Sequence, residues 1–212
     1  MLILWKRLFQ LIKGNKLYRL GVILISFIFL YLILIFNYQE IHIGLIFTLP
    51  VNFEEEPFFK LIGYNLFPIL YYLFATFLML DVFSDFVSKE NPIIKVRRLD
   101  SLLVLFIHFI TILLYSILLS ILMKIGMLLF FQKHIPIFEF AYSIIFIILW
   151  QLVFTCFSLI GFMPGAYMIL FISLSVCSVI AIKFEHQFLI IGIACIILMS
   201  LNIMIYRRKE NL

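Results

Sequence analysis

Charged residues are scarce in this sequence: aspartate, glutamate, lysine and arginine make up 13% of its 212 residues, whereas 66% are hydrophobic. A soluble domain is about one quarter charged, and a soluble fold of this composition could not cover its apolar surface with so few charges. The high hydrophobicity also excludes a disordered chain. Three cysteines, a small and odd number, exclude a disulfide scaffold. The composition therefore predicts an integral membrane protein.

Sequence motifs for nucleotide or metal chemistry are also missing. None of the eight glycines begins a G-x-x-x-x-G-K-[ST] loop, and the four histidines lie far apart without H-E-x-x-H spacing. We therefore expect no catalytic residue, no metal site and no cofactor on this chain, and any ATP must be bound by another chain. The predicted spans contain no acidic or basic residue near their middle, which argues against a proton-driven transporter.

Long uncharged runs predict where the chain crosses the membrane, because each spanning helix needs about 20 mostly apolar residues. The run 140–182 is 43 residues long, and Pro164 with Gly165 near its middle indicates a tight turn between two helices. We therefore predict an all-α integral membrane protein, a single membrane domain over 1–212, with six transmembrane helices at about 17–36, 61–83, 101–123, 138–163, 166–182 and 187–206.

The positions of the basic residues predict the orientation. Twelve of the 16 lysines and arginines fall in three segments: the residues before the first span, the connection between the second and third spans, and the C-terminal tail. Cytoplasmic flanks carry an excess of lysine and arginine. We therefore expect both termini in the cytoplasm, and we attribute the net charge of +5 to topology and contact with anionic lipid rather than to nucleic-acid binding.

The first 16 residues have the pattern of a basic amphipathic helix. Apolar side chains recur at helical spacing with basic and polar residues between them, which is typical of a helix lying in the membrane interface. The residues expected to contact lipid are Trp5, Leu8, Phe9 and Ile12. The alternative is a plain positive flank that only sets the topology.

Segment 84–100, between the second and third spans, has a similar pattern. Asn91 followed by Pro92 resembles an N-cap and the first position of a helix. The residues after them would form an apolar face and a basic face, namely Ile93, Ile94, Val96 and Leu99 against Lys95, Arg97 and Arg98. The pattern predicts a short cytoplasmic helix, and a solvated charged loop is the alternative.

Uncharged polar residues cluster on two of the predicted spans. Each set lies on one helix face because of its spacing: His108, Thr111 and Tyr115 on the third span, and Gln151, Thr155 and Ser158 on the fourth. Such residues either join helices by hydrogen bonds or line a transport pathway. Both interpretations remain open from the sequence.

The order of these pieces resembles the ABC-2-type transporter permeases, most closely the small permeases of peptide-export and bacteriocin- or lantibiotic-immunity systems in low-GC Gram-positive bacteria. Residues 83–96 (FSDFVSKENPIIKV) are similar to the family's stretch in which a serine followed by lysine or arginine precedes a short helix and a new span. One departure is the connection between the last two spans, of about four residues, which leaves no room for the extracellular helices that many such permeases have.

The resemblance implies a bacterial cell-membrane protein that is not itself an enzyme. It implies a coupling helix that docks on an ABC-type ATP-binding subunit carrying ATP and Mg, through Lys89, Pro92, Ile93, Ile94, Lys95, Val96, Arg97 and Arg98. The N-terminal helix would be the interfacial elbow helix, in contact with membrane lipid. A second permease copy or a related permease would complete the pathway, giving a homo- or heterodimer. The substrate would be amphipathic or hydrophobic, such as an antimicrobial peptide, and would be exported.

Two other functions fit the sequence. The first is a stand-alone bacteriocin-immunity or membrane interaction protein that needs no ATPase. The second is an intramembrane enzyme, because Glu55, Glu56 and Lys60 partly match the E-E-x-x-x-R motif of CAAX-type proteases, and Phe130 and His134 give that family's F-x-x-x-H spacing. The arginine of the motif is replaced by lysine and the family's later histidine motif is missing, so the enzyme is the weaker alternative.

Overall fold

The computed structural model describes the chain at residues 16–36, 66–87, 101–131, 134–162 and 184–210, and at positions 5, 6, 10, 11, 13, 165, 168, 169 and 172. Within these residues the protein is helical and contains no strand, as the sequence predicts. The helices are α2 (Lys16–Phe36), α4 (Leu66–Phe77), α5 (Leu80–Val87), α7 (Ser101–Phe131), α8 (Ile137–Ile160) and α10 (Phe184–Glu210).

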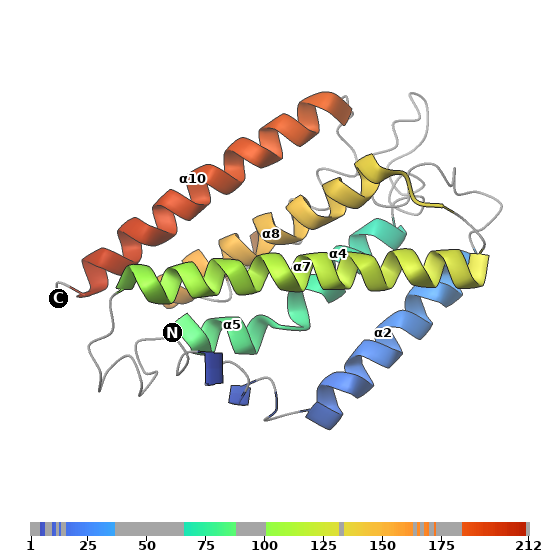
Figure 1. Cartoon of the computed structure of the whole chain (residues 1–212), viewed down its shortest axis with the longest axis horizontal. Helices are drawn as coiled ribbons and strands as arrows, with labels where there is room; N and C mark the ends of the chain where they lie inside the picture. The colour runs from blue at the N-terminus through green and yellow to red at the C-terminus, as the bar shows by residue number, and fades with distance from the viewer. Residues whose placement is uncertain are drawn as a thin grey trace.

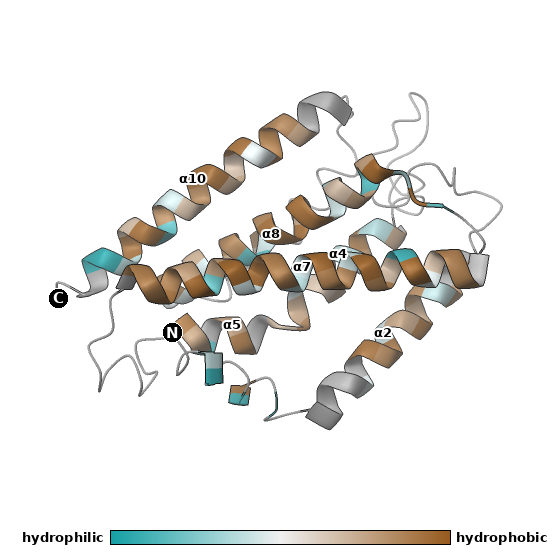
Figure 2. Ribbon diagram, in the orientation of Figure 1, coloured by the Kyte–Doolittle hydropathy of each residue, from teal (hydrophilic) through white to brown (hydrophobic). Residues whose placement is uncertain are grey.

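Three described segments are long and apolar enough to cross a membrane: Leu102–Leu129, Ile137–Ile160 and Phe188–Arg208. Figure 2 shows that most of their residues are hydrophobic, with hydrophilic ones at the C-terminal end of α10. Shorter apolar segments cover Ile23–Leu32 and Phe67–Phe77. These lengths and compositions indicate a membrane protein, and the number of six crossings stays a prediction because the range 166–182 lies largely outside the described residues.

The described helices run in two opposite directions along the length of the molecule (Figure 1). Helices α2 and α7 run one way, whereas α4 with α5, α8 and α10 run the other way. The direction alternates from α2 to α8, as in a chain that crosses a membrane repeatedly, whereas α8 and α10 run the same way. The side of the membrane on which each end lies, and so the cytoplasmic position of the termini, stays a prediction.

The second expected span differs from the prediction. The sequence predicts one continuous helix over 61–83, whereas the structure has two helices separated by a turn at Leu78 and Met79. The second of them, α5, ends at Val87, and so extends into the range expected for the cytoplasmic segment. The chain has neither proline nor glycine between Ala75 and Val87, so the local sequence gave no sign of a break.

The third expected span is also longer than predicted, because α7 continues to Phe131. Lys124, which we expected in the following connection, therefore lies within the helix. Its ammonium group sits 5.1 Å from the centre of the Phe140 ring of α8, a distance at which the cation is attracted by the ring face. This contact allows a lysine to lie in the last turns of an otherwise apolar helix.

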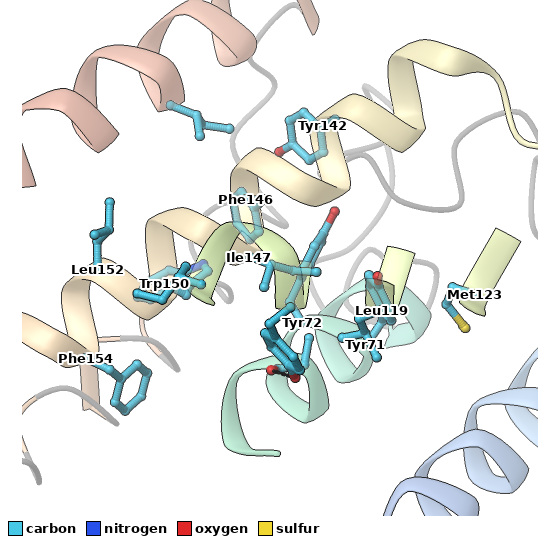
Figure 3. Close-up of a cluster of buried hydrophobic side chains, with 14 of the residues drawn as sticks. Tyr71, Tyr72, Leu119, Met123, Tyr142, Phe146, Ile147, Trp150, Leu152 and Phe154 are labelled. Carbon is cyan, nitrogen blue, oxygen red and sulfur yellow. Dashed lines mark hydrogen bonds between the residues drawn. The ribbon is translucent and has the colours of Figure 1, made fainter. Parts of the chain in front are cut away.

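Helix α8 occupies the centre of the described structure and contacts α4, α5, α7 and α10. Its aromatic side chains form the middle of the main hydrophobic cluster, where Phe146 lies 4.4 Å from Tyr72 of α4 and 6.1 Å from Trp150, measured between ring centres. Figure 3 shows the side chains of α4, α7 and α8 meeting in this cluster. In contrast, only 11% of the most apolar stretch within Phe188–Arg208 is buried within the chain. Most of α10 is therefore available to lipid or to another protein.

The described positions near the N-terminus have the two faces of an amphipathic helix. Trp5 and Leu11 are half-buried and pack against a second hydrophobic cluster, whereas Lys6, Gln10 and Lys13 are exposed. That cluster joins the end of α5 to α7, α8 and α10 through Phe86, Val87, Val104, Leu105, Ile107, Leu159 and Tyr206. The other expected lipid-contacting residues, Leu8, Phe9 and Ile12, lie outside the described residues, and contact with the membrane interface stays a prediction.

The central position of α8 predicts where substitutions destabilise the fold. Replacement of Phe146, which is 4% exposed, by alanine should lower the free energy of unfolding by about 3 kcal/mol, because the cavity cannot be refilled by its ring neighbours. Ile197→Ala on the exposed face of α10 is the matched control and should have little effect. Unfolding in mixed micelles, followed by circular dichroism, measures both variants, and equal losses would contradict the assigned core.

Candidate functional site

The candidate site is a group of buried polar side chains beside the break between α4 and α5. Five of the six residues predicted as candidates from the two polar faces are buried, with His108 and Gln151 completely inaccessible. The others of the five are Thr111, Tyr115 and Thr155. Ser158 is half-buried nearer the end of α8, where its carbonyl accepts a hydrogen bond from the Gly161 N–H at 3.1 Å.

Two of these side chains bind the backbone at the break itself. The Tyr115 hydroxyl of α7 donates to the Ala75 carbonyl at 2.5 Å, and the Gln151 amide of α8 donates to the carbonyls of Ala75 and Thr76 at 3.4 and 3.2 Å. The last carbonyls of any helix lack intrahelical partners, and lipid supplies no water to replace them. The side chains of two neighbouring helices therefore provide the hydrogen bonds that end α4.

The backbone hydrogen bonds mark where the helical ladder stops. The Leu78 amide still bonds to the Phe74 carbonyl, and the Phe83 amide bonds to the Met79 carbonyl, both at 3.0 Å. Between these two bonds lies the turn at Leu78 and Met79. Insertion of a side chain into the ladder is a recognised cause of a break in a helix without proline, and Tyr115 and Gln151 occupy that position here.

A second set of contacts fixes the tautomer of His108. The Thr155 hydroxyl donates its only proton to the Gln151 carbonyl at 2.8 Å. The 2.8 Å contact between His108 Nε2 and Thr155 Oγ1 must therefore use a proton on Nε2. His108 Nδ1 is then an acceptor, and neither it nor the Gln151 side-chain oxygen has a hydrogen-bond partner within the described part of the chain.

Helix α5 closes the site with aromatic rings. Phe83 meets the His108 ring edge-on at 5.6 Å and the Tyr115 ring at 5.7 Å, measured between ring centres. Phe86 lies nearly parallel to His108 at 6.2 Å. The position of α5 and the environment of the histidine are therefore linked.

Thr111 differs from its neighbours on α7. Its hydroxyl donates to the Ile107 carbonyl of its own helix at 2.7 Å. Only some residues of the predicted polar faces form hydrogen bonds between helices, namely His108, Tyr115, Gln151 and Thr155. These bonds are those expected for packing between helices, and a lining role in transport is left to the proposal below.

The structure also shows buried polar residues that the sequence analysis did not single out. Ser120 of α7 and Ser143 of α8 lie 2.6 Å apart through their hydroxyls, and the Asn202 amide of α10 donates to the Leu152 carbonyl at 3.0 Å. Asn202 could have been identified from the sequence, since it is an amide side chain within an apolar run. Glu139, in the first turn of α8, is 3% exposed; its place at a helix N-terminus suits its charge.

The predicted coupling residues lie outside the described part of the chain: Lys89, Pro92, Ile93, Ile94, Lys95, Val96, Arg97 and Arg98. Helix α5 ends at Val87, two positions before the first of them in the sequence. The same holds for Glu55, Glu56 and Lys60 of the alternative enzyme site, whereas its His134 is described and lies exposed before α8. Neither set is therefore tested by the geometry.

Comparisons with protein-family models, with curated proteins and with solved structures gave no match to the chain. Among the residues that the structure describes, no three or more histidine, cysteine, aspartate or glutamate side chains gather in a way that could hold a metal ion. Function must therefore be argued from the broken helix and its polar surroundings.

A double-mutant cycle tests the link between α7 and α8. His108→Leu and Thr155→Val should each lower the free energy of unfolding. The loss in the double variant should be about 1 kcal/mol smaller than the sum of the two single losses, because both substitutions remove the same hydrogen bond. Ser116→Ala combined with Thr155→Val is the control, since the Ser116 hydroxyl bonds to Ile112 of its own helix. Unfolding in mixed micelles measures the cycle, and additive losses for His108 and Thr155 would argue against the bond.

Proposed function

We propose that this chain is the membrane-spanning permease subunit of an ATP-binding-cassette exporter in a bacterial cell membrane. It moves an amphipathic or hydrophobic substrate, such as a peptide, using ATP that a separate subunit binds with Mg and hydrolyses. The observation that carries the proposal is the break between α4 and α5, which lies against buried polar side chains of α7 and α8. Secondary transporters place interrupted helices at their substrate sites, so the break supports a transport role by analogy.

The position of α5 supports a mechanical role. It is a short helix of eight residues, joined to α4 by the break and followed in the sequence by the basic segment that begins at Lys89. Its last residues, Phe86 and Val87, are completely buried in the second hydrophobic cluster. A displacement of the basic segment by an ATPase would therefore reach the break through α5 and alter the contacts of Phe83 with His108 and Tyr115.

The exposed surface of the chain supports partnership with a second permease. Helix α10 presents large apolar side chains along its length, among them Leu189, Ile193 and Ile196. Lipid covers such a surface in a lone protomer, and a second copy or a related permease covers part of it in a dimer. The dimer places a pathway between the two protomers.

A charge-reversal experiment tests the ATPase contact. The chain is purified from its native membranes in mild detergent, and an ATP-binding-cassette subunit identified by mass spectrometry should co-purify. Replacing Arg97 and Arg98 by glutamate should reduce the recovered ATPase at least tenfold, because opposite charge on that subunit attracts them. The matched control replaces Arg207 and Arg208, which are exposed at the end of α10, and should leave the recovery unchanged.

Two outcomes would contradict the permease. One is that no ATP-binding-cassette subunit accompanies the purified chain. The other is that the chain gives cells full resistance to a peptide toxin when every such subunit is absent, which would favour the stand-alone immunity protein. Loss of function on replacing Glu55, Glu56 and His134 together by alanine would instead favour the enzyme.

A further inference from the structure

We infer that α4 and α5 form a two-state element that changes between the interrupted helix of this structure and one continuous helix. In the continuous form, the carbonyls of Ala75 and Thr76 accept hydrogen bonds from the backbone amides of Met79 and Leu80. The inference goes beyond the proposed function, because it concerns the chain alone and requires neither an ATPase nor a substrate.

The two forms compete for the same acceptors. In an α-helix each carbonyl accepts from the amide four residues ahead, which pairs Ala75 with Met79 and Thr76 with Leu80. In the structure these carbonyls accept from Tyr115 and Gln151 instead. The side chains of α7 and α8 supply these hydrogen bonds in the interrupted form, and the helix's own amides supply them in the continuous form.

The local sequence permits the continuous form. Residues 75–82 read Ala-Thr-Phe-Leu-Met-Leu-Asp-Val, and alanine, leucine and methionine are among the best helix formers. No proline or glycine prevents the helix from continuing. The interruption is therefore imposed by contacts with other helices, and a change in those contacts can reverse it.

The aromatic contacts of α5 couple this change to the polar site. Straightening the helix would move Phe83 and Phe86 relative to His108, against which both rings now lie. Tyr115 and the Gln151 amide would lose their carbonyl acceptors at the same time. The continuous form would thus present these polar groups, with His108 Nδ1, to water or to a polar part of a substrate, whereas the interrupted form shields them.

A distance between spin labels on the two helices distinguishes the forms. The labels are placed at Ile69→Cys and Asp85→Cys, in a chain whose native cysteines Cys156, Cys177 and Cys195 are changed to alanine. A continuous helix rises about 1.5 Å per residue and fixes the Cα separation near 24 Å. Pulsed electron paramagnetic resonance on the purified chain in lipid nanodiscs should give a different main distance in the otherwise unchanged protein.

Removing the two side-chain donors should populate the continuous helix. Tyr115→Phe with Gln151→Leu should raise the ratio of the 24 Å component to the main component by about tenfold, since two buried hydrogen bonds are lost from the interrupted form only. Hydrogen exchange at the amide of Leu80 should slow in parallel. Ser116→Ala is the control, because its hydroxyl bonds to its own helix, and it should change neither measurement.

A proline at the start of α5 should lock the interrupted form. Proline is tolerated in the first turn of a helix but has no amide to offer Thr76. Leu80→Pro should therefore keep the distance of the unchanged protein, even when combined with the Tyr115 and Gln151 substitutions. Leu80→Ala retains the amide and is the matched control, in which the shift should persist.

Three results would overturn the inference: a main distance of 24 Å in the otherwise unchanged protein, no shift in the Tyr115 and Gln151 variant, or an equal shift in Ser116→Ala. If the double variant is not monodisperse, the label distances are measured in each single variant instead. Each single variant should then show the same change in the ratio of the two distance components, but a smaller one. The measurement uses the purified chain and leaves Arg97 and Arg98 unchanged. Its failure would therefore leave the ATPase contact standing, and loss of that contact would leave this inference standing.

Discussion

Two backbone carbonyls, those of Ala75 and Thr76, set the arrangement of the central helices. Where α4 ends inside the bundle, no water is at hand to satisfy its last carbonyls, and an unsatisfied buried acceptor costs about 1–3 kcal/mol. Tyr115 and Gln151 meet this demand from two different helices. Helices α7 and α8 must therefore lie beside α4 at one rotation and one height, so that their side chains reach the same turn. The hydrogen bonds therefore align three helices at once.

The remaining polar contacts reinforce this alignment along α8. Thr155 accepts from His108 one turn further along the helix, Ser143 meets Ser120 two turns in the other direction, and Asn202 binds the backbone at Leu152. Apolar side chains pack well at many rotations, and lipid gives them no strong preference for one another. A few directional bonds therefore specify the register of the helices, while aromatic residues such as Phe146 fill the volume between them.

The sequence was a good guide to the helices and to the polar faces, because both depend on spacing within one segment. Uncharged runs predicted the positions of α7, α8 and α10, and the spacing of His108 and Tyr115 placed them on one buried face. The break between α4 and α5 could not be predicted in the same way. The residues at the break allow a helix, and the side chains that bind its carbonyls, Tyr115 and Gln151, lie 40 and 76 positions away along the chain. Only the assembled bundle brings donor and acceptor together.

A break made in this way differs physically from one made by proline. A proline removes an amide permanently, so the kink is the same in every state of the protein. Here every amide of 75–82 is retained in the covalent structure, and the interruption lasts only while the side chains of α7 and α8 stay in place. The helix is therefore sensitive to any force that separates α5 from α7. The neighbouring basic segment, with four lysines and arginines from Lys89 to Arg98, gives a partner of opposite charge a place at which to apply such a force.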